Sequence, residues 1–260
     1  MFVQEPMVTG AQLSKLLATE SLSLVAELEG ASNGAYVASL GDLEVVYKPV
    51  SGETPLWDFP MHTLSKREVM ASWVDEHFGW NLVPPTVWAK KGPLGPGSVQ
   101  VFINQAQVKD VDIFPPDEIP ADWAAILEGT LDGKPVVVAH TLTDDVMRLA
   151  ALDVILNNAD RKAGHVLRDD EGHLKAIDHG VCFHPQYKLR SVLWGWVGEP
   201  LNEHLQTEIR SGLLVLEQNA ADWLLSQHEF DVMLQRGRQL VENGFPEPSD
   251  QWPAVPWPIF

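Results

Sequence analysis

Three polar side chains in the second half of the chain have the types and spacing needed for chemistry at one centre. Asp160 and His165 lie in the segment NNADRKAGHV, and Asp178 follows in IDHGVCFH. A loop Asp is a candidate general base, a His is a candidate metal ligand, and a carboxylate that leaves an apolar strand can hold Mg²⁺. Phosphoryl transfer needs such a set, because its transition state is stabilised mainly by positioning and by charge. The set therefore indicates metal-assisted phosphotransfer.

Each carboxylate also has a purely structural interpretation. Asp is common in turns, so Asp160 could cap the end of the preceding helix. Asp178 could be a surface residue that ends a strand, but its apolar neighbours predict a buried strand, where an uncompensated carboxylate is unfavourable. The order of the motifs around both residues favours the catalytic interpretation.

The histidines between residues 165 and 184 raise the alternative of a zinc site. The chain has no H-E-x-x-H motif, and Cys182 is its single cysteine, so a zinc site is not favoured and an internal disulfide is excluded. We expect His179 and His184 to be structural, and Cys182 to be a small buried apolar residue.

The elements before residue 105 have the pattern of strands and two helices. Thr9 is expected to cap a helix through GAQLSKLLA. An antiparallel meander is predicted over SLSLVAELEG, AYVASLG and LEVVYKPV, with later strands in LVPPTVWAK and SVQVFINQA. Ser65 and Glu68 have the form of a capping box that opens the helix KREVMASWVDEHF, and Gly79 is expected to end it.

From about residue 105 the pattern becomes helical and irregular. TLTDDVMRLAALDVILNN predicts a buried helix, HVLRD and HLKAID predict a hairpin, and one or two helices follow Asn202. We therefore predict an α+β fold with two lobes. A small antiparallel-sheet lobe would span residues 1–104, a mainly helical lobe 105–245, and a tail rich in Pro and Trp 246–260. Trp194 and Trp196 are expected to be packing residues.

Composition excludes several classes of partner. The formal charge of -18, from 36 acidic and 18 basic residues, would repel a phosphate backbone, so nucleic acid is not expected as a partner. No apolar run is long enough to cross a bilayer, and no basic segment followed by an apolar one opens the chain. We predict a cytoplasmic protein without integral membrane association.

The ordered set of motifs resembles a known family. Asp160-Arg161-Lys162 followed by Asp178-His179-Gly180 is similar to the catalytic core of phosphatidylinositol kinases. Together with YKPV, WDFP, GWNLVPPT and LWGWVGEPL, these motifs resemble the actinobacterial phosphatidylinositol 3- and 4-kinase-like proteins, and more distantly HipA-type kinases. The likeness runs from about Gly30 to Leu201. It implies a bilobal protein-kinase-like fold and an ATP-dependent kinase.

The resemblance implies catalytic and metal-binding roles for four residues. Asp160 would orient or deprotonate the accepting hydroxyl, with Arg161 beside it in the catalytic motif. Asp178 and His165 would hold the Mg²⁺ or Mn²⁺ that bridges the ATP phosphates. His165 stands where kinases place Asn, and imidazole favours softer ions than Mg²⁺. A preference for Mn²⁺, or weak turnover, is therefore expected.

The resemblance also implies a nucleotide site. Lys48 would contact the α- and β-phosphates, with Glu68 as its ion-pair partner and Glu76 as the alternative on the same helix. Two backbone segments would complete the site: a phosphate-covering turn with Gly30, Asn33 and Gly34, and an adenine-binding hinge with Phe102, Ile103 and Asn104. The turn GASNG lacks the full G-x-G-x-x-G pattern.

The leading functional interpretation is transfer of the γ-phosphate of ATP to a hydroxyl of a protein, lipid or small-molecule acceptor. A strongly acidic chain without a basic amphipathic helix is poorly matched to an anionic membrane surface, so a lipid acceptor is not preferred. A nucleotide-binding pseudokinase that acts through a partner protein is the alternative. A metal-dependent hydrolase is a third possibility, and it would not require Lys48.

Overall fold

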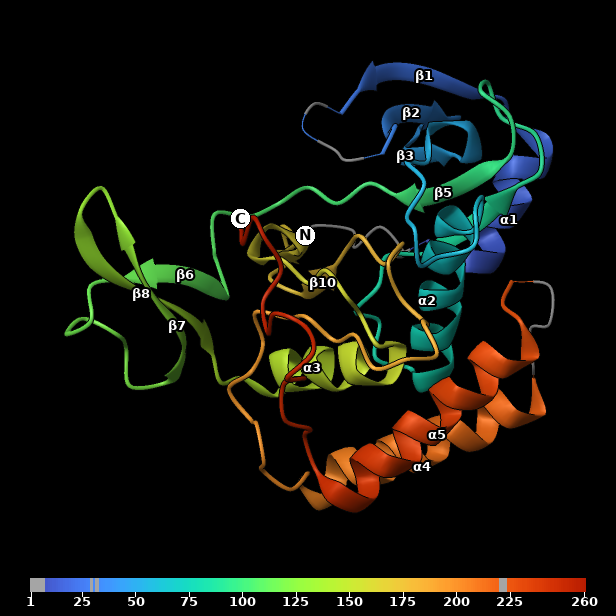
Figure 1. The fold of residues 1–260 in the computed structure, drawn as a ribbon. Helices are drawn as coiled ribbons and strands as arrows, with labels where there is room; N and C mark the ends of the chain where they lie inside the picture. The colour runs from blue at the N-terminus through green and yellow to red at the C-terminus, as the bar shows by residue number, and fades with distance from the viewer. Residues whose placement is uncertain (1–7, 29, 31–32, 220–223) are drawn as a thin grey trace, which may run out of the picture.

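The structure, a computed structural model, describes residues 8–28, 30, 33–219 and 224–260. An antiparallel sheet forms the N-terminal part and helices dominate the C-terminal part, which confirms the predicted α+β class (Figure 1). The extended segment 102–110 links the two parts. The predicted boundaries after residues 104 and 245 stay predictions.

The N-terminal sheet positions one lysine on the face opposite its core. Its strands, in the order β1-β2-β3-β5-β4, are β1 (Leu22–Glu27), β2 (Tyr36–Leu40), β3 (Leu43–Pro49), β5 (Gly97–Val101) and β4 (Thr86–Ala89). Val45 and Tyr47 of β3 are fully buried, and because side chains alternate along a strand, Lys48 points the other way. A Cβ at Gly97 would lie 2.3 Å from the Lys48 carbonyl oxygen, so only glycine lets β5 pair closely there.

Two helices accompany this sheet. Helix α1 (Gly10–Thr19) begins with the predicted cap, since the Thr9 hydroxyl accepts from the Gln12 N–H and the Gln12 side chain accepts from the Thr9 N–H. Helix α2 (Leu64–Phe78) ends at Gly79, as predicted, in the left-handed conformation at φ 70°. A short 3-10 turn, Val50–Gly52, lies between β3 and α2.

The predicted capping box of α2 is wrong. Thr63 is the N-cap residue, and it makes no side-chain cap. Ser65 instead bonds through its N–H and hydroxyl to Glu53, at 2.8 and 2.7 Å, and Glu68 bonds to Lys48. Both side chains sit inside the helix and are used for tertiary contacts, which overrides the local capping pattern.

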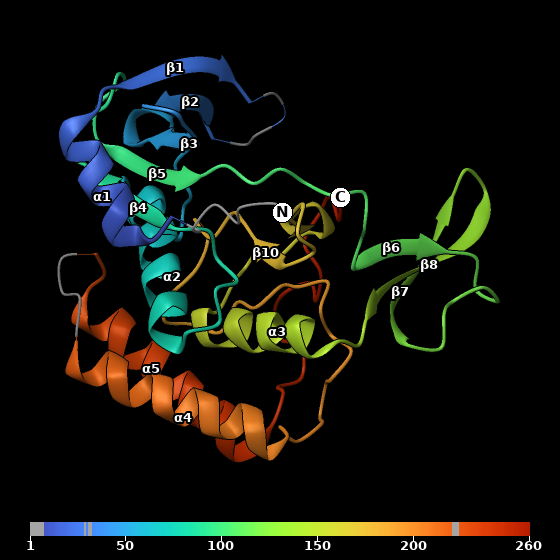
Figure 2. The ribbon, with the colours of Figure 1, turned by 180° about the vertical axis from the view of Figure 1, so that it is seen from behind.

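The helical and irregular pattern predicted after residue 105 is wrong for residues 111–141. This region is a three-stranded antiparallel sheet of β6 (Val111–Phe114), β7 (Trp123–Leu131) and β8 (Lys134–Thr141), in the order β6-β8-β7. It projects from the rest of the molecule in both ribbon views (Figures 1 and 2). The missed signal is Asp132-Gly133, because both residues have positive φ, 50° and 77°, as a two-residue hairpin requires.

The remaining elements agree with the sequence. They are α3 (Asp144–Leu156), a 3-10 turn (Ala163–His165), the hairpin of β9 (Val166–Arg168) and β10 (Leu174–Ala176), α4 (Glu203–Gln218) and α5 (Gln227–Asn243). Helix α3 packs on α5 and on β10, and α2 packs on α4. The larger hydrophobic core surrounds α3, whose Leu149, Leu152 and Ile155 are fully buried. This core fixes the loop that follows α3.

The tail after residue 245 has no helix or strand, but it is packed. It runs back past α3 (Figure 1), where the Ala163 N–H donates to the Ile259 carbonyl at 2.8 Å and the Trp194 indole donates to the Ala254 carbonyl at 2.8 Å. Trp196 is buried in the core, so the predicted packing role of this tryptophan pair is confirmed. Across the described residues, no helix is long and apolar enough to cross a membrane.

Candidate active site

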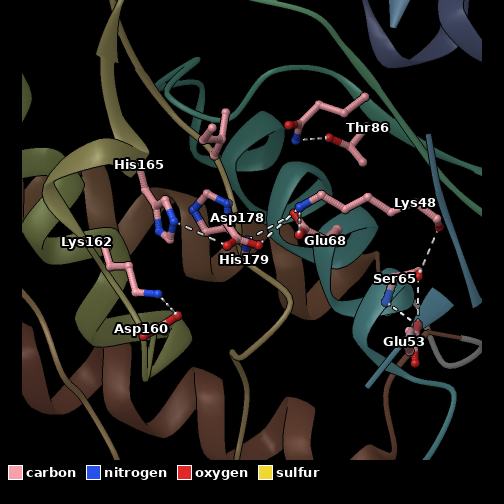
Figure 3. Close-up of polar contacts among 12 residues, drawn as sticks. Lys48, Glu53, Ser65, Glu68, Thr86, Asp160, Lys162, His165, Asp178 and His179 are labelled. Carbon is pink, nitrogen blue, oxygen red and sulfur yellow. Dashed lines mark hydrogen bonds and ion pairs between the residues drawn. The ribbon is translucent and has the colours of Figure 1, made fainter. Parts of the chain in front are cut away.

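Three charged side chains from three separate elements meet at one point (Figure 3). Lys48 Nζ, from β3, lies 2.5 Å from Glu68 Oε1, on α2, and 3.1 Å from Asp178 Oδ1, after β10. Glu68 is buried, whereas Asp178 is 43% exposed. Glu76, the alternative partner from the sequence, is exposed on the same helix. The structure therefore pairs Lys48 with Glu68.

The electrostatic interactions within this cluster keep Lys48 and Asp178 charged. Burial alone would lower the pKa of Lys48, but the carboxylates of Asp178 and Glu68 outweigh it and raise this pKa. The Lys48 ammonium in turn holds the pKa of Asp178 well below its usual range, and burial raises the pKa of Glu68. Lys48 and Asp178 are ionised at neutral pH, as contacts to phosphate and to a metal require.

The turn that carries Asp178 is tied to helix α2. Asp178 has φ 62°, a left-handed conformation that is uncommon for a residue other than glycine and that clusters at functional sites. The next N–H, of His179, donates to Glu68 Oε2 at 3.0 Å. Glu68 thus holds both Lys48 and the backbone beside Asp178.

Asp160 and Lys162 form a second ion pair in the loop after α3. Lys162 Nζ lies 3.3 Å from Asp160 Oδ2, and the Asp160 N–H donates to Asn158 Oδ1 at 3.0 Å. Burial raises the pKa of Asp160, while the Lys162 ammonium acts in the opposite direction. A carboxylate with a raised pKa is a better proton acceptor than an ordinary surface Asp, and this suits the general-base role predicted for Asp160.

His165 faces the other oxygen of Asp178. Its Nε2 lies 3.3 Å from Asp178 Oδ2, opposite to the approach of Lys48 (Figure 3). Burial lowers the pKa of His165 to about 4, so the imidazole is neutral at physiological pH and has a lone pair to offer. A carboxylate and a neutral imidazole at this separation fit a divalent cation. Within the described ranges, no three His, Cys, Asp or Glu side chains gather as a metal site, so the other ligands would be substrate oxygens and water.

Comparison with models of protein families found no match. Comparison with individual proteins gave a full-length relative, protein Rv2133c of Mycobacterium tuberculosis (strain ATCC 25618 / H37Rv), which is 36% identical over 264 residues and covers 94% of both chains. The chain belongs to the Rv2133c family. The resemblance inferred from the motifs is confirmed, since a distant similarity extends to phosphatidylinositol 4-kinase gamma 4 of Oryza sativa subsp. japonica. That match is 30% identical over 126 residues, 45% of this chain and 18% of the plant protein.

The kinase-like fold of this Rv2133c-family chain is also confirmed. The crystal structure of the Golgi casein kinase matches with a TM-score of 0.50 over 94% of this chain and 75% of that one, at 13% identity. At this identity the likeness concerns the fold alone. The antiparallel sheet and the helical part are therefore the two lobes of a kinase fold.

In this member of the Rv2133c family, Arg161 is not placed to contact a substrate. The sequence grouped it with the catalytic residues, but its side chain is fully buried. Its guanidinium forms two bonds to Asp153, at 2.9 and 3.0 Å, a third to the Ile177 carbonyl at 2.8 Å, and contacts His179 Nε2 at 2.7 Å. Arg161 therefore links the Asp160 loop to the Asp178 turn as a positioning residue, and the structural role expected for His179 is confirmed.

The predicted phosphate-covering turn is only partly described. Ala31 and Ser32 lie outside the described residues. Asn33 Oδ1 accepts from the Thr54 N–H at 2.6 Å, and the Gly34 N–H donates to the Gly52 carbonyl at 2.9 Å. This side of the turn is fixed against the 3-10 turn after Lys48, while Gly30 has φ 82° and a phosphate contact stays a prediction.

The first residue of the predicted hinge, Phe102, is still hydrogen-bonded to the sheet. The Phe102 N–H donates to the Glu44 carbonyl at 3.1 Å, which continues the sheet, so this N–H is already engaged. Ile103 is half-buried and Asn104 is exposed. An adenine contact would fall to these two residues, and it stays a prediction.

Two residues of the site did not emerge as site residues from the sequence. Lys162 pairs with Asp160, and its position two residues after a candidate base was a usable signal. Asp153 is buried on α3 and holds Arg161 through both oxygens. The sequence signal for Asp153 was a carboxylate within an otherwise apolar helix, because a buried charge requires a partner.

Proposed function

We propose that the chain is an ATP- and divalent-metal-dependent phosphotransferase that transfers the γ-phosphate to a hydroxyl. The observation that supports this proposal most strongly is the Lys48–Glu68–Asp178 cluster. Its three members come from the sheet, from α2 and from the turn after β10, and they form one connected group of ion pairs. This is the arrangement that kinases use to hold ATP phosphates and their metal.

Each side chain has a defined task in the proposed reaction. Lys48 binds phosphate oxygens of ATP, and Glu68 orients its ammonium. Asp160 orients the accepting hydroxyl and takes its proton, for which the pKa raised by burial is suited. Lys162, beside Asp160, balances the negative charge of the transferred phosphoryl group.

A divalent cation would be held by Asp178 and His165. When bound, it neutralises charge on the ATP phosphates and helps to orient them. The carboxylate suits Mg²⁺ and the imidazole suits Mn²⁺, so the donor pair favours Mn²⁺ more than two oxygen donors would.

The acceptor is the hydroxyl of a protein, small molecule or lipid head group. The similarity to phosphatidylinositol 4-kinase gamma 4 supports an alcohol acceptor. The net charge of -18 argues against stable binding to an anionic membrane. ATP as the donor fits the cytoplasmic location predicted from the sequence.

Calorimetric titration of ATP, with Mg²⁺ and with Mn²⁺, followed by an ADP-release assay on the same samples, tests the proposal. Wild type is compared with Asp178→Asn and with Asp170→Asn, which removes the same charge at the exposed tip of the β9–β10 hairpin. We expect metal-dependent binding and ADP release in wild type and Asp170→Asn, and loss of both in Asp178→Asn.

Two other outcomes have definite meanings. Metal-dependent binding without ADP release supports the pseudokinase, with His165 in place of Asn as the change that removed turnover. Failure of ATP to bind with either metal contradicts nucleotide chemistry altogether.

A further inference from the structure

A pocket lies in the helical lobe, and its walls contain none of the residues of the candidate active site. It has a volume of about 530 Å³ and lies between α5, the end of α3 and the start of the tail. Its walls are mainly apolar, with Val154 of α3, Val232 and Leu240 of α5, and Phe245 and Pro246 after it. This volume and this lining are typical of sites for small organic ligands.

One cation interrupts this apolar wall. Arg236 lies on α5 between Val232 and Leu240 at intervals of four residues, so the three side chains share one face of the helix. Arg236 is only 9% exposed. Its Nε donates to the Ile155 carbonyl at 3.0 Å and its Nη1 donates to the His184 carbonyl at 3.2 Å. These two carbonyls fix the guanidinium in the wall.

The charge of Arg236 has no counter-ion in the described part of the chain. Its Nη2 is enclosed and has no hydrogen-bond partner there, and no carboxylate forms an ion pair with it. Burial lowers the pKa of Arg236 to about 10, so the side chain is still charged at neutral pH. A buried guanidinium without an anion is unfavourable. The chain has twice as many acidic as basic residues, so the lack of a carboxylate beside Arg236 is unusual for this protein.

We propose that this pocket binds a small amphiphilic anion, whose apolar body lies along α5 and whose carboxylate or phosphate head reaches the enclosed Nη2 of Arg236 when the lining side chains shift. A carboxylate or phosphate accepts the paired N–H groups that a guanidinium presents. The apolar wall removes the rest of such a ligand from water. This site would work independently of the nucleotide site, so it does not depend on the proposed kinase activity.

Calorimetric titration with decanoate, decyl phosphate and decanol, below their aggregation concentrations, tests the inference. We expect at least one of the two anions to bind one per chain, and decanol to bind about tenfold more weakly or not at all, because it lacks the charge. The stronger of the two anions indicates whether the natural head group is a carboxylate or a phosphate.

Two variants locate the site. Arg236→Met removes the cation and puts an unbranched apolar side chain in its place. Gln239→Trp places a large ring at an exposed position of the pocket rim. Both are expected to weaken binding of the anion by about tenfold or more, while far-UV circular dichroism confirms that they are folded. Gln239→Trp keeps the test decisive if Arg236→Met does not fold.

The inference is overturned by any of three results: neither anion binds the folded wild type, decanol binds as tightly as the anions, or both anions bind Gln239→Trp with unchanged affinity. Retention of ATP binding in both variants is expected, because the pocket shares no residue with the nucleotide site.

Discussion

At the level of single residues, we predict that the identity of position 165 sets the metal preference of the proposed phosphotransferase. His165 presents a neutral imidazole 3.3 Å from Asp178, where kinases place an amide. Replacing it by Asn substitutes an oxygen donor for a nitrogen donor, and hard cations prefer oxygen. We expect His165→Asn to shift the ratio of ADP-release rates with Mg²⁺ and with Mn²⁺ by about tenfold toward Mg²⁺.

His173→Asn is the matched control for this prediction. His173 lies on the exposed turn of the β9–β10 hairpin, where its closest charged partners are Asp169 and Glu171. His173→Asn therefore makes the same substitution away from Asp178. Its metal preference should equal that of wild type. An unchanged Mg²⁺ to Mn²⁺ ratio in His165→Asn would remove His165 from the metal site.

At the level of elements, helix α2 carries a buried acid as well as the ion-pair residue Glu68. Asp75 is 1% exposed, and its Oδ2 accepts from the Val83 N–H at 2.9 Å, which holds the loop after the helix. Burial raises the pKa of Asp75 from 3.8 to about 7. Between these pH values the folded chain therefore binds more protons than the unfolded chain, so the free energy of unfolding falls as the pH rises from about 4 to about 7.

Asp75→Asn should remove this pH dependence, because the amide stays neutral. We expect the stability of the variant relative to wild type to be greater at pH 8 than at pH 5, by at most about 3 kcal/mol. Urea unfolding at both pH values measures the difference. Glu76→Gln, at the exposed neighbouring position, should show none. Equal differences at pH 5 and pH 8 for Asp75→Asn would contradict the proposed titration.

Prediction of elements from sequence succeeded where the pattern and the burial agree. Strands β2 and β3 alternate between buried and less buried side chains, and α3 is apolar almost all round, so these elements were identified. Sheet β6–β8 was missed because β7 is largely exposed and supplies little apolar alternation. The α2 cap was misjudged because Ser65 and Glu68 serve contacts with Glu53 and Lys48, and contacts between distant segments leave no local signal.

At the level of the whole molecule, the sequence predicted which residues matter better than how they are held. Lys48 and Asp178 are 130 positions apart, and only the order of the motifs suggested that they meet. Arg161 illustrates the limit. Its position beside Asp160 suggested catalysis, whereas its complete burial against Asp153 follows from packing of α3 against the Asp178 turn.

The C-terminal tail packs against the loop that carries Asp160, so it is part of the fold. Ile259 is 9% exposed, and its carbonyl accepts from Ala163, in the loop that carries Asp160 and Lys162. Ile259→Ala removes buried apolar atoms and should lower the free energy of unfolding by about 2 kcal/mol or more. Trp257 is 84% exposed, so Trp257→Ala should change it by less than about 0.5 kcal/mol. Urea unfolding of both variants compares the two effects. Equal effects would mean that the tail is not docked through Ile259, and the Asp160 loop would then have to be held by α3 and Arg161 alone.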